Sequence, residues 1–182
     1  MTPEVTIAIV EEASVSVALD AELRGFLMRA FPEGSTSFAR TRYWHGSAPV
    51  YSVLAQHNGN VVAHAGVIVR EIRVGRQAVC IFGIQNMGVL PEARGTGMGL
   101  RALEAAAREA KRRGIAFGVL FCVPELKRYY KRDHWKTREV TVTMDFDGRT
   151  NVPIQGKNVC MVKCLTEEEF PEGPIRLQGA DW

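Results

Sequence analysis

The amino-acid sequence predicts an α/β (α+β) fold, with a mixed and mostly antiparallel sheet, two central parallel strands and flanking helices. Residues 50–90 contain three strand-like runs separated by tight turns, a pattern typical of an antiparallel meander. A helical segment, 100–114, then leads to the nearly all-apolar run 115–123, and this crossover makes the strands on either side of it parallel. Because 182 residues with 46% hydrophobic content supply one substantial core, we expect a single domain over residues 1–182.

The first 49 residues are predicted to form one strand, one helix and a long loop. The apolar run 5–10 is interpreted as a short edge strand. Apolar side chains recur at helical spacing over 20–31, which predicts a helix that ends before Pro32. Residues 32–49 are polar and carry several aromatic side chains, and a loop of this length in a compact domain is more often functional than idle.

The rest of the chain alternates between strand and helix patterns. Strands are predicted over residues 50–56, 61–74, 77–90, 115–123, 139–146 and 158–165. Helices are predicted over 100–114 and 124–135. A turn region at 147–151 separates the last two strands, and residues 166–182 are expected to be irregular.

Charge and composition narrow the class of protein. Lys and Arg total 23 against 20 for Asp and Glu, and they form no long run or stripe, so no nucleic-acid partner is expected. The N-terminal apolar stretch has no positive leader and is closed by Glu11 and Glu12, which predicts neither a signal peptide nor a membrane segment. A cytoplasmic location without membrane partners is the expectation.

Four cysteines lie in apolar runs, at positions 80, 122, 160 and 164. Their spacing lacks the two paired Cys-x-x-Cys motifs of a structural zinc site, so no metal site is predicted. We interpret all four as buried, reduced thiols.

A glycine-rich turn is the most informative motif in the chain. After the strand 77–90, glycines at 95, 97 and 99 open the helix 100–114. Glycines allow close approach of a ligand to the backbone, and the helix N-terminus favours an anion, so this turn predicts a pyrophosphate site. A Rossmann site is not favoured, because the preceding strand belongs to a meander and no acidic strand end follows; a Walker loop lacks its Gly-Lys-Ser/Thr.

The motif Arg94-x-x-Gly97-x-Gly99 resembles the coenzyme A loop of the GCN5-related N-acetyltransferases (GNATs), and Tyr129-Tyr130-x-x-x-His134-Trp135 resembles a later segment of that family. The resemblance implies the GNAT fold, in which two central parallel strands, here 85–90 and 117–122, splay apart, and it implies acetyl-CoA as cosubstrate. It implies that acetyl-CoA is bound by Met87, Gly88, Val89, Arg94, Gly95, Thr96, Gly97, Met98 and Gly99. It also implies that Tyr130 protonates the leaving thiolate, in a direct transfer without a covalent enzyme intermediate; a core aromatic is the alternative for this tyrosine.

A closer resemblance is to the aminoglycoside 2'-N-acetyltransferases. It rests on Ala63-His64-Ala65-x-Val67-Ile68 with Arg70 and Gly75, on Ala30-Phe31, and on the ending Gly-x-Asp-Trp. By this resemblance, Asp181 and Trp182 contact ammonium groups of the substrate. A frayed terminus is the alternative for these two residues.

The general base is the main departure from that family. Its members have a glutamate at the position of Gln85, and a glutamine cannot act as a general base. Deprotonation of the substrate amine must then use water and backbone carbonyls or another acidic side chain, unless the amine is already partly neutral. Glu33 and His64 are candidates, although a histidine inside an apolar strand is more often a packed, hydrogen-bonded residue.

The expected function is transfer of an acetyl group to the 2'-amino group of an aminoglycoside or amino sugar. Because the chain is mildly basic and Gln85 replaces an acid, a less cationic substrate such as kasugamycin is favoured, with Glu33, Gln85, Asp181 and Trp182 on the substrate side. Three alternatives stay open. The meander and glycine loop also resemble the nodulation N-acyltransferases, which move fatty acyl chains to an oligosaccharide amine. The substrate could instead be another small-molecule amine, or the chain could be a non-catalytic acyl-CoA-binding module. Whether the protein forms a homodimer stays open.

Overall fold

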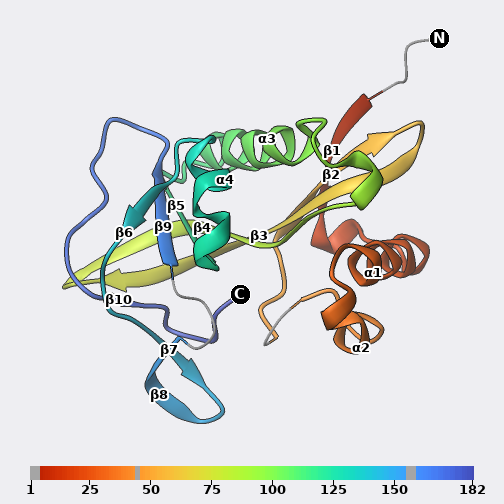
Figure 1. Ribbon diagram of the computed structural model, residues 1–182. Coiled ribbons are helices and arrows are strands. Elements are labelled where there is room, and N and C mark those ends of the chain that lie inside the picture. Colours follow the sequence, from red (N-terminus) through yellow and green to blue (C-terminus); the bar gives the residue numbers. More distant parts are fainter. Residues whose placement is uncertain (1–4, 44–45, 155–158) are drawn as a thin grey trace. The chain divides into compact units, whose positions relative to one another are not determined.

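The computed structural model describes residues 5–43, 46–154 and 159–182 (Figure 1). The described chain forms two compact units. Unit 1 holds residues 5–43, 48–68 and 85–106, and unit 2 holds 46–47, 69–84, 107–154 and 159–182. Three elements contribute to both units, namely β3 (Asn60–Val74), β4 (Gln77–Val89) and α3 (Met98–Arg112). That the whole chain acts as one domain stays a prediction.

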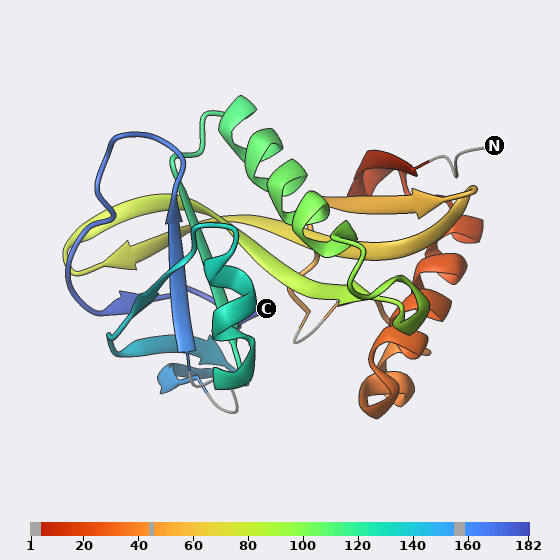
Figure 2. The ribbon, with the colours of Figure 1, turned by 45° about the horizontal axis from the view of Figure 1, so that its top comes forward.

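Unit 1 is built around α1 (Val17–Ala30). This helix begins three residues earlier than predicted, because the Ser16 hydroxyl accepts a hydrogen bond from the Leu19 N–H (3.2 Å) and so caps the first turn. Its apolar face is buried in a core that includes Phe38 of α2 (Ser35–Phe38), and α1 and α2 lie side by side (Figures 1 and 2). The predicted loop 32–49 therefore contains a short helix.

The strands of unit 1 follow the predicted antiparallel order. β1 (Val5–Glu11) pairs with β2 (Tyr51–His57), and β2 pairs with β3 from Asn60 to Val67. The side chains of β2 and β3 that line this region are mostly buried, so the strands form one wall of the core beneath α1.

Unit 2 contains a mixed sheet in the order β6-β9-β5-β4-β3-β10-β7-β8. Its remaining strands are β5 (Phe117–Cys122), β6 (Lys136–Arg138), β7 (Val142–Phe146), β8 (Arg149–Pro153), β9 (Val159–Cys164) and β10 (Ile175–Arg176). Ile81–Gly83 of β4 pair in parallel with Phe117–Val119 of β5, which confirms the predicted crossover. Splaying of these strands beyond this pairing stays a prediction.

Three predictions about unit 2 were wrong in detail. The turn region 147–151 contains most of β8, since the reversal needs only Asp147 and Gly148, both at positive φ. The tail contains β10, which pairs with both β3 and β7 and so gains its strand conformation from tertiary neighbours. Cys122 and Cys160 are buried as predicted, but Cys80 and Cys164 are exposed. Cys80 points to the opposite face of β4 from the buried Val79 and Ile81, and Cys164 is the last residue of β9, where the burial of that strand ends.

None of the helices in the described part of the chain is long and apolar enough to cross a membrane.

Candidate functional site

The glycine-rich turn lies in unit 1, between the end of β4 and the start of α3. The Thr96 hydroxyl donates to the Ala93 carbonyl (2.6 Å), and the Arg94 Nε–H donates to the Val89 carbonyl (3.3 Å), so side chains of the loop hold its backbone in place. Gly95 and Gly97 have φ of +79° and +83°, a region that L-residues rarely adopt.

This loop is open to a ligand. Residues 94–97 are exposed, and a Cβ built on Gly95 or Gly97 meets no atom within 4 Å. The first turn of α3 contains no acidic residue, so the positive end of a 15-residue helix is not neutralised there. Backbone N–H groups at a helix N-terminus suit a pyrophosphate, and the residues present therefore fit the predicted coenzyme A loop.

The last residues of β4 pack tightly within unit 1. A Cβ on Gly88 would lie 3.0 Å from the Phe31 ring and 3.1 Å from Ala30, so only glycine leaves the end of α1 undisturbed. Gln85 is buried, and its Cγ lies 3.0 Å from where Gly66 would carry a Cβ. The candidates Gln85, Met87, Gly88 and Val89 thus line one strand segment that leads into the loop.

Glu33 is exposed and lies in a single 3₁₀ turn, Pro32–Gly34, directly after α1. Its proposed contact with substrate stays a prediction. His64 is buried and uses both ring nitrogens in contacts with Asn86 and Ser52, which confirms the packed, hydrogen-bonded alternative.

Tyr130 lies in unit 2, on the short helix α4 (Lys127–Lys131), and its side chain is buried. Its ring packs edge-on against Tyr129, with 5.3 Å between the ring centroids. Burial raises the pKa of Tyr130 well above its ordinary value, with Cys122 and Tyr129 adding to the rise. The phenol is therefore protonated across the neutral and mildly alkaline range, as a proton donor must be.

The tail residues Asp181 and Trp182 are firmly docked in unit 2, so the frayed-terminus alternative is wrong. The Ser47 hydroxyl donates to the Asp181 carbonyl (2.9 Å), and Arg70 donates to the carbonyl of Ala180 (2.6 Å). The indole of Trp182 lies directly over Gly83, where an added Cβ would be only 2.5 Å away. Both Asp181 and Trp182 are buried, and their contact with a substrate stays a prediction.

Unit 2 also contains a pocket of about 330 Å³ that was not predicted from the sequence. Its apolar wall comes from Phe121, Val140, Val142, Ile154 and Val159, and polar side chains, among them those of Lys127 and Arg138, complete it. The same Phe121 packs against Trp182, with ring centroids 5.3 Å apart. No motif marks this pocket, because its residues come from five separate segments that only the folded sheet brings together.

Comparison with known proteins identifies the family. The family model "Nodulation protein A (NodA)" matches residues 2–160. Nodulation protein A of Azorhizobium caulinodans is 28% identical over 138 residues, which is 72% of this chain and 60% of that protein. The corresponding protein of Bradyrhizobium elkanii is 27% identical over 127 residues, 66% of this chain and 59% of that protein. The chain thus spans about three fifths of the length of these curated relatives.

Solved structures show the fold. A GNAT family N-acetyltransferase (YhbS) from Escherichia coli, in complex with CoA, has a TM-score of 0.66 at 15% identity and covers 98% of this chain and 93% of its own. A GNAT family acetyltransferase from Brucella melitensis, in complex with acetyl-CoA, has a TM-score of 0.60 at 17% identity, with 93% and 94% covered. The predicted GNAT fold is therefore confirmed.

These findings agree with the prediction of an acyltransferase enzyme, and they change the kind of acyltransferase that is favoured. They lend no support to the antibiotic substrates, and they favour the nodulation alternative over the aminoglycoside interpretation. With a match that covers residues 2–160, the chain belongs to the nodulation protein A family.

Proposed function

We propose that this chain is an acyl-CoA-dependent N-acyltransferase of the nodulation type, which transfers an acyl group to a primary amine of an amino sugar. The family match over residues 2–160 carries this proposal. The GNAT fold and the open glycine loop with its favourable helix end support it.

The proposed reaction is a direct transfer. The loop amides from Arg94 to Gly99 hold the pyrophosphate of the donor, and a backbone N–H within Met87–Val89 hydrogen-bonds the thioester carbonyl. The neutral amine attacks the carbonyl carbon, the C–N bond forms and the C–S bond breaks. Tyr130 gives its proton to the sulfur and is reprotonated from solvent. Because Gln85 cannot accept a proton, the amine releases its proton to water.

The family match favours a donor longer than acetyl, because the nodulation N-acyltransferases that the sequence resembles move fatty acyl chains. Burial of each methylene of an acyl chain against an apolar surface contributes about 0.8 kcal/mol. Turnover by an enzyme that binds a long acyl chain should therefore rise with the length of the donor chain.

Donor length and amine class together test the proposal. Purified protein would be assayed for thiol release with acetyl-, octanoyl- and palmitoyl-CoA, against glucosamine oligomers, kasugamycin, an aminoglycoside and a polyamine. We expect turnover on the amino-sugar oligomers that rises with chain length. Turnover confined to acetyl-CoA with kasugamycin would restore the antibiotic interpretation, and donor binding without thiol release on any amine would favour a non-catalytic module.

Gly97 gives a second test, directed at the donor loop. Gly97→Ala should weaken acyl-CoA binding about tenfold, because an L-residue at positive φ costs roughly 1–2 kcal/mol and the loop relaxes away from its binding conformation. The matched control is Gly148→Ala in the β7–β8 turn, which also has positive φ and open space around it. Calorimetry should record an unchanged Kd for the control; equal losses in both variants would remove the loop from the donor site.

A further inference from the structure

Asn86 has an unusual backbone conformation in the middle of the candidate site. Its φ is +49°, although it lies inside the strand β4, between Gln85 and Met87. A non-glycine residue in this region is uncommon, and surrounding contacts must hold it there. The strained residue directly precedes Met87–Val89, the segment proposed to hold the thioester.

Two contacts hold Asn86. Its side-chain Nδ2–H donates to the carbonyl of Arg42 (2.6 Å), and its own carbonyl lies 2.9 Å from Nδ1 of His64. The other ring nitrogen of His64, Nε2, lies 3.2 Å from the Ser52 hydroxyl. His64, Ser52 and Asn86 are all buried, so these hydrogen bonds are shielded from water.

The partners of His64 determine its tautomer. A carbonyl oxygen only accepts, so Nδ1 must carry the proton and donate it to Asn86; Nε2 then accepts from the Ser52 hydroxyl. Burial lowers the pKa of His64 to about 4, and the charge of Arg42 adds to this, against the opposing effect of the Asn86 carbonyl. The ring is therefore neutral, in one tautomer, throughout the range in which an enzyme of this kind would work.

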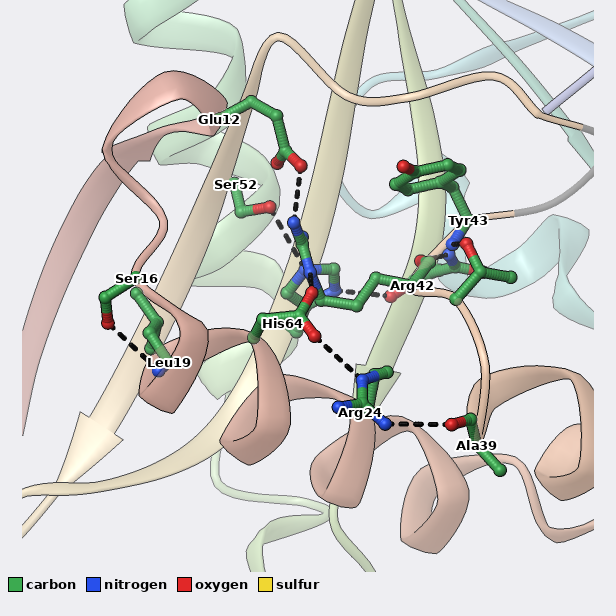
Figure 3. Close-up of polar contacts among 12 residues, drawn as sticks. Glu12, Ser16, Leu19, Arg24, Ala39, Arg42, Tyr43, Ser52 and His64 are labelled. Atoms are coloured by element: carbon green, nitrogen blue, oxygen red, sulfur yellow. Dashed lines mark hydrogen bonds and ion pairs between the residues drawn. The ribbon is translucent and has the colours of Figure 1, made fainter.

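Arg42 is itself rigidly held (Figure 3). Its guanidinium is buried and forms ion pairs with Glu12 and with Asp20 (2.6 Å to the latter). Asp20 in turn binds Arg24 (2.8 Å), which anchors the group to α1. The carbonyl that receives the Asn86 side chain is thus fixed by a network of four charged residues.

The orientation of the Asn86 carbonyl also fixes the orientation of the Met87 N–H, because both belong to the same peptide group. In a planar trans peptide the C=O and the following N–H point in opposite directions, so a carbonyl directed at His64 sends the Met87 N–H away from His64. We propose that His64 is a positioning residue, which acts through the Asn86 carbonyl to aim the Met87 N–H at the donor thioester. That the Met87 N–H points at a donor thioester rests on the proposed function. That His64 controls the orientation of this peptide group does not.

Substitutions of Asn86 separate backbone conformation from side-chain chemistry. Asn86→Gly adopts positive φ without strain, whereas Asn86→Ala does not, and both lose the amide side chain. We expect Asn86→Gly to keep kcat within about threefold of the original and Asn86→Ala to lose at least about tenfold, a barrier change of about 1.4 kcal/mol. Equal losses in the two variants would overturn the proposal. The pair Asn58→Gly and Asn58→Ala, at φ +51° in the exposed β2–β3 turn, provides the control.

Substitutions of His64 test the positioning role directly. His64→Leu should lower kcat by about ten- to a hundredfold, with the KM for acyl-CoA changed less than about threefold. His64→Asn, whose amide N–H lies close to the position of Nδ1–H, should recover much of that loss. His57→Leu, at the end of β2, is the matched control and should leave kcat unchanged. A uniform fall in the fraction of folded protein, with kcat per folded molecule unchanged, would reduce His64 to a structural role.

Amide hydrogen exchange provides a measurement that needs no turnover. In the free protein, His64→Leu should increase exchange at Met87–Val89 by at least about tenfold, while amides of β1 remain protected. His64→Asn should restore protection. Unchanged exchange at Met87–Val89 would overturn the proposal even for an active enzyme. If exchange increases as expected but the protein acylates no amine, the control of the backbone by His64 stands and only the proposed function is refuted.

Discussion

Replacing Tyr130 with phenylalanine should lower kcat by about a hundredfold, while the Kd for acyl-CoA stays within about twofold. The phenol is buried, and its raised pKa keeps it protonated, so it can supply the proton that the departing thiolate needs. Removing only the hydroxyl leaves the packing against Tyr129 in place. Steady-state kinetics for kcat and calorimetry for the Kd would check the two expectations separately.

Tyr129 offers a neighbouring control of the same residue type. Its hydroxyl is buried without a hydrogen-bond partner among the described residues, and burial raises its pKa to about 12. Tyr129→Phe removes an unsatisfied polar atom, so it should leave kcat unchanged and be neutral or slightly stabilising. If Tyr129→Phe lowered kcat as much as Tyr130→Phe, or if Tyr130→Phe lost donor binding instead, the assignment of the proton donor would be refuted.

Replacing Trp182 with alanine should destabilise the protein by about 3–5 kcal/mol, the usual cost of removing a large buried aromatic side chain. The indole covers Gly83, packs against Phe121 and lies under the Arg70 guanidinium, 5.5 Å from it. The resulting cavity would remove the packing of all three residues against the indole. Denaturant unfolding, followed by a probe of unit 2, would measure the change in free energy.

A double-mutant cycle with Gly83 tests whether this packing is the cause. Gly83→Ala alone should cost about 1–3 kcal/mol, because its Cβ would lie 2.5 Å from the indole. In the Trp182→Ala background the same change should cost almost nothing, since the obstruction is gone. Gly25→Ala, in the middle of α1 with open space around it, should stabilise by about 0.5–1 kcal/mol and shows that added methyl groups are not harmful in general. Additive effects of Gly83→Ala and Trp182→Ala would contradict the proposed packing.

Local patterns account for the parts of the fold that were predicted correctly. The meander follows from alternating apolar runs and tight turns, and the parallel pair β4–β5 follows from a helix between two apolar strands. The coenzyme A loop was predictable because its glycines and the helix after it are adjacent in sequence. By contrast, β10 is two residues long and is a strand only because β3 and β7 flank it.

The site was harder to predict than the fold, because its remaining parts are not local. Asn86 tolerates positive φ better than most residues, but a single asparagine inside an apolar strand does not reveal that His64 and Arg42 hold it there. The comparisons favour another acceptor than the sequence did, for a related reason. The aminoglycoside interpretation gave weight to the ending Gly-x-Asp-Trp, which lies outside the residues that the family model matches.

The placement of β10 between β3 and β7 has a consequence for the order of folding. During synthesis, the β7–β8 hairpin leaves the ribosome before Ile175 and Arg176, and until these two residues arrive β7 lacks its parallel neighbour. The sheet of unit 2 can therefore close only after residues 175–176 have been synthesised, whereas α1, β1 and β2 of unit 1 are available to pack before then. A nascent chain would expose the edge of β7 in the interval, and chaperone binding or aggregation should be most sensitive to changes there.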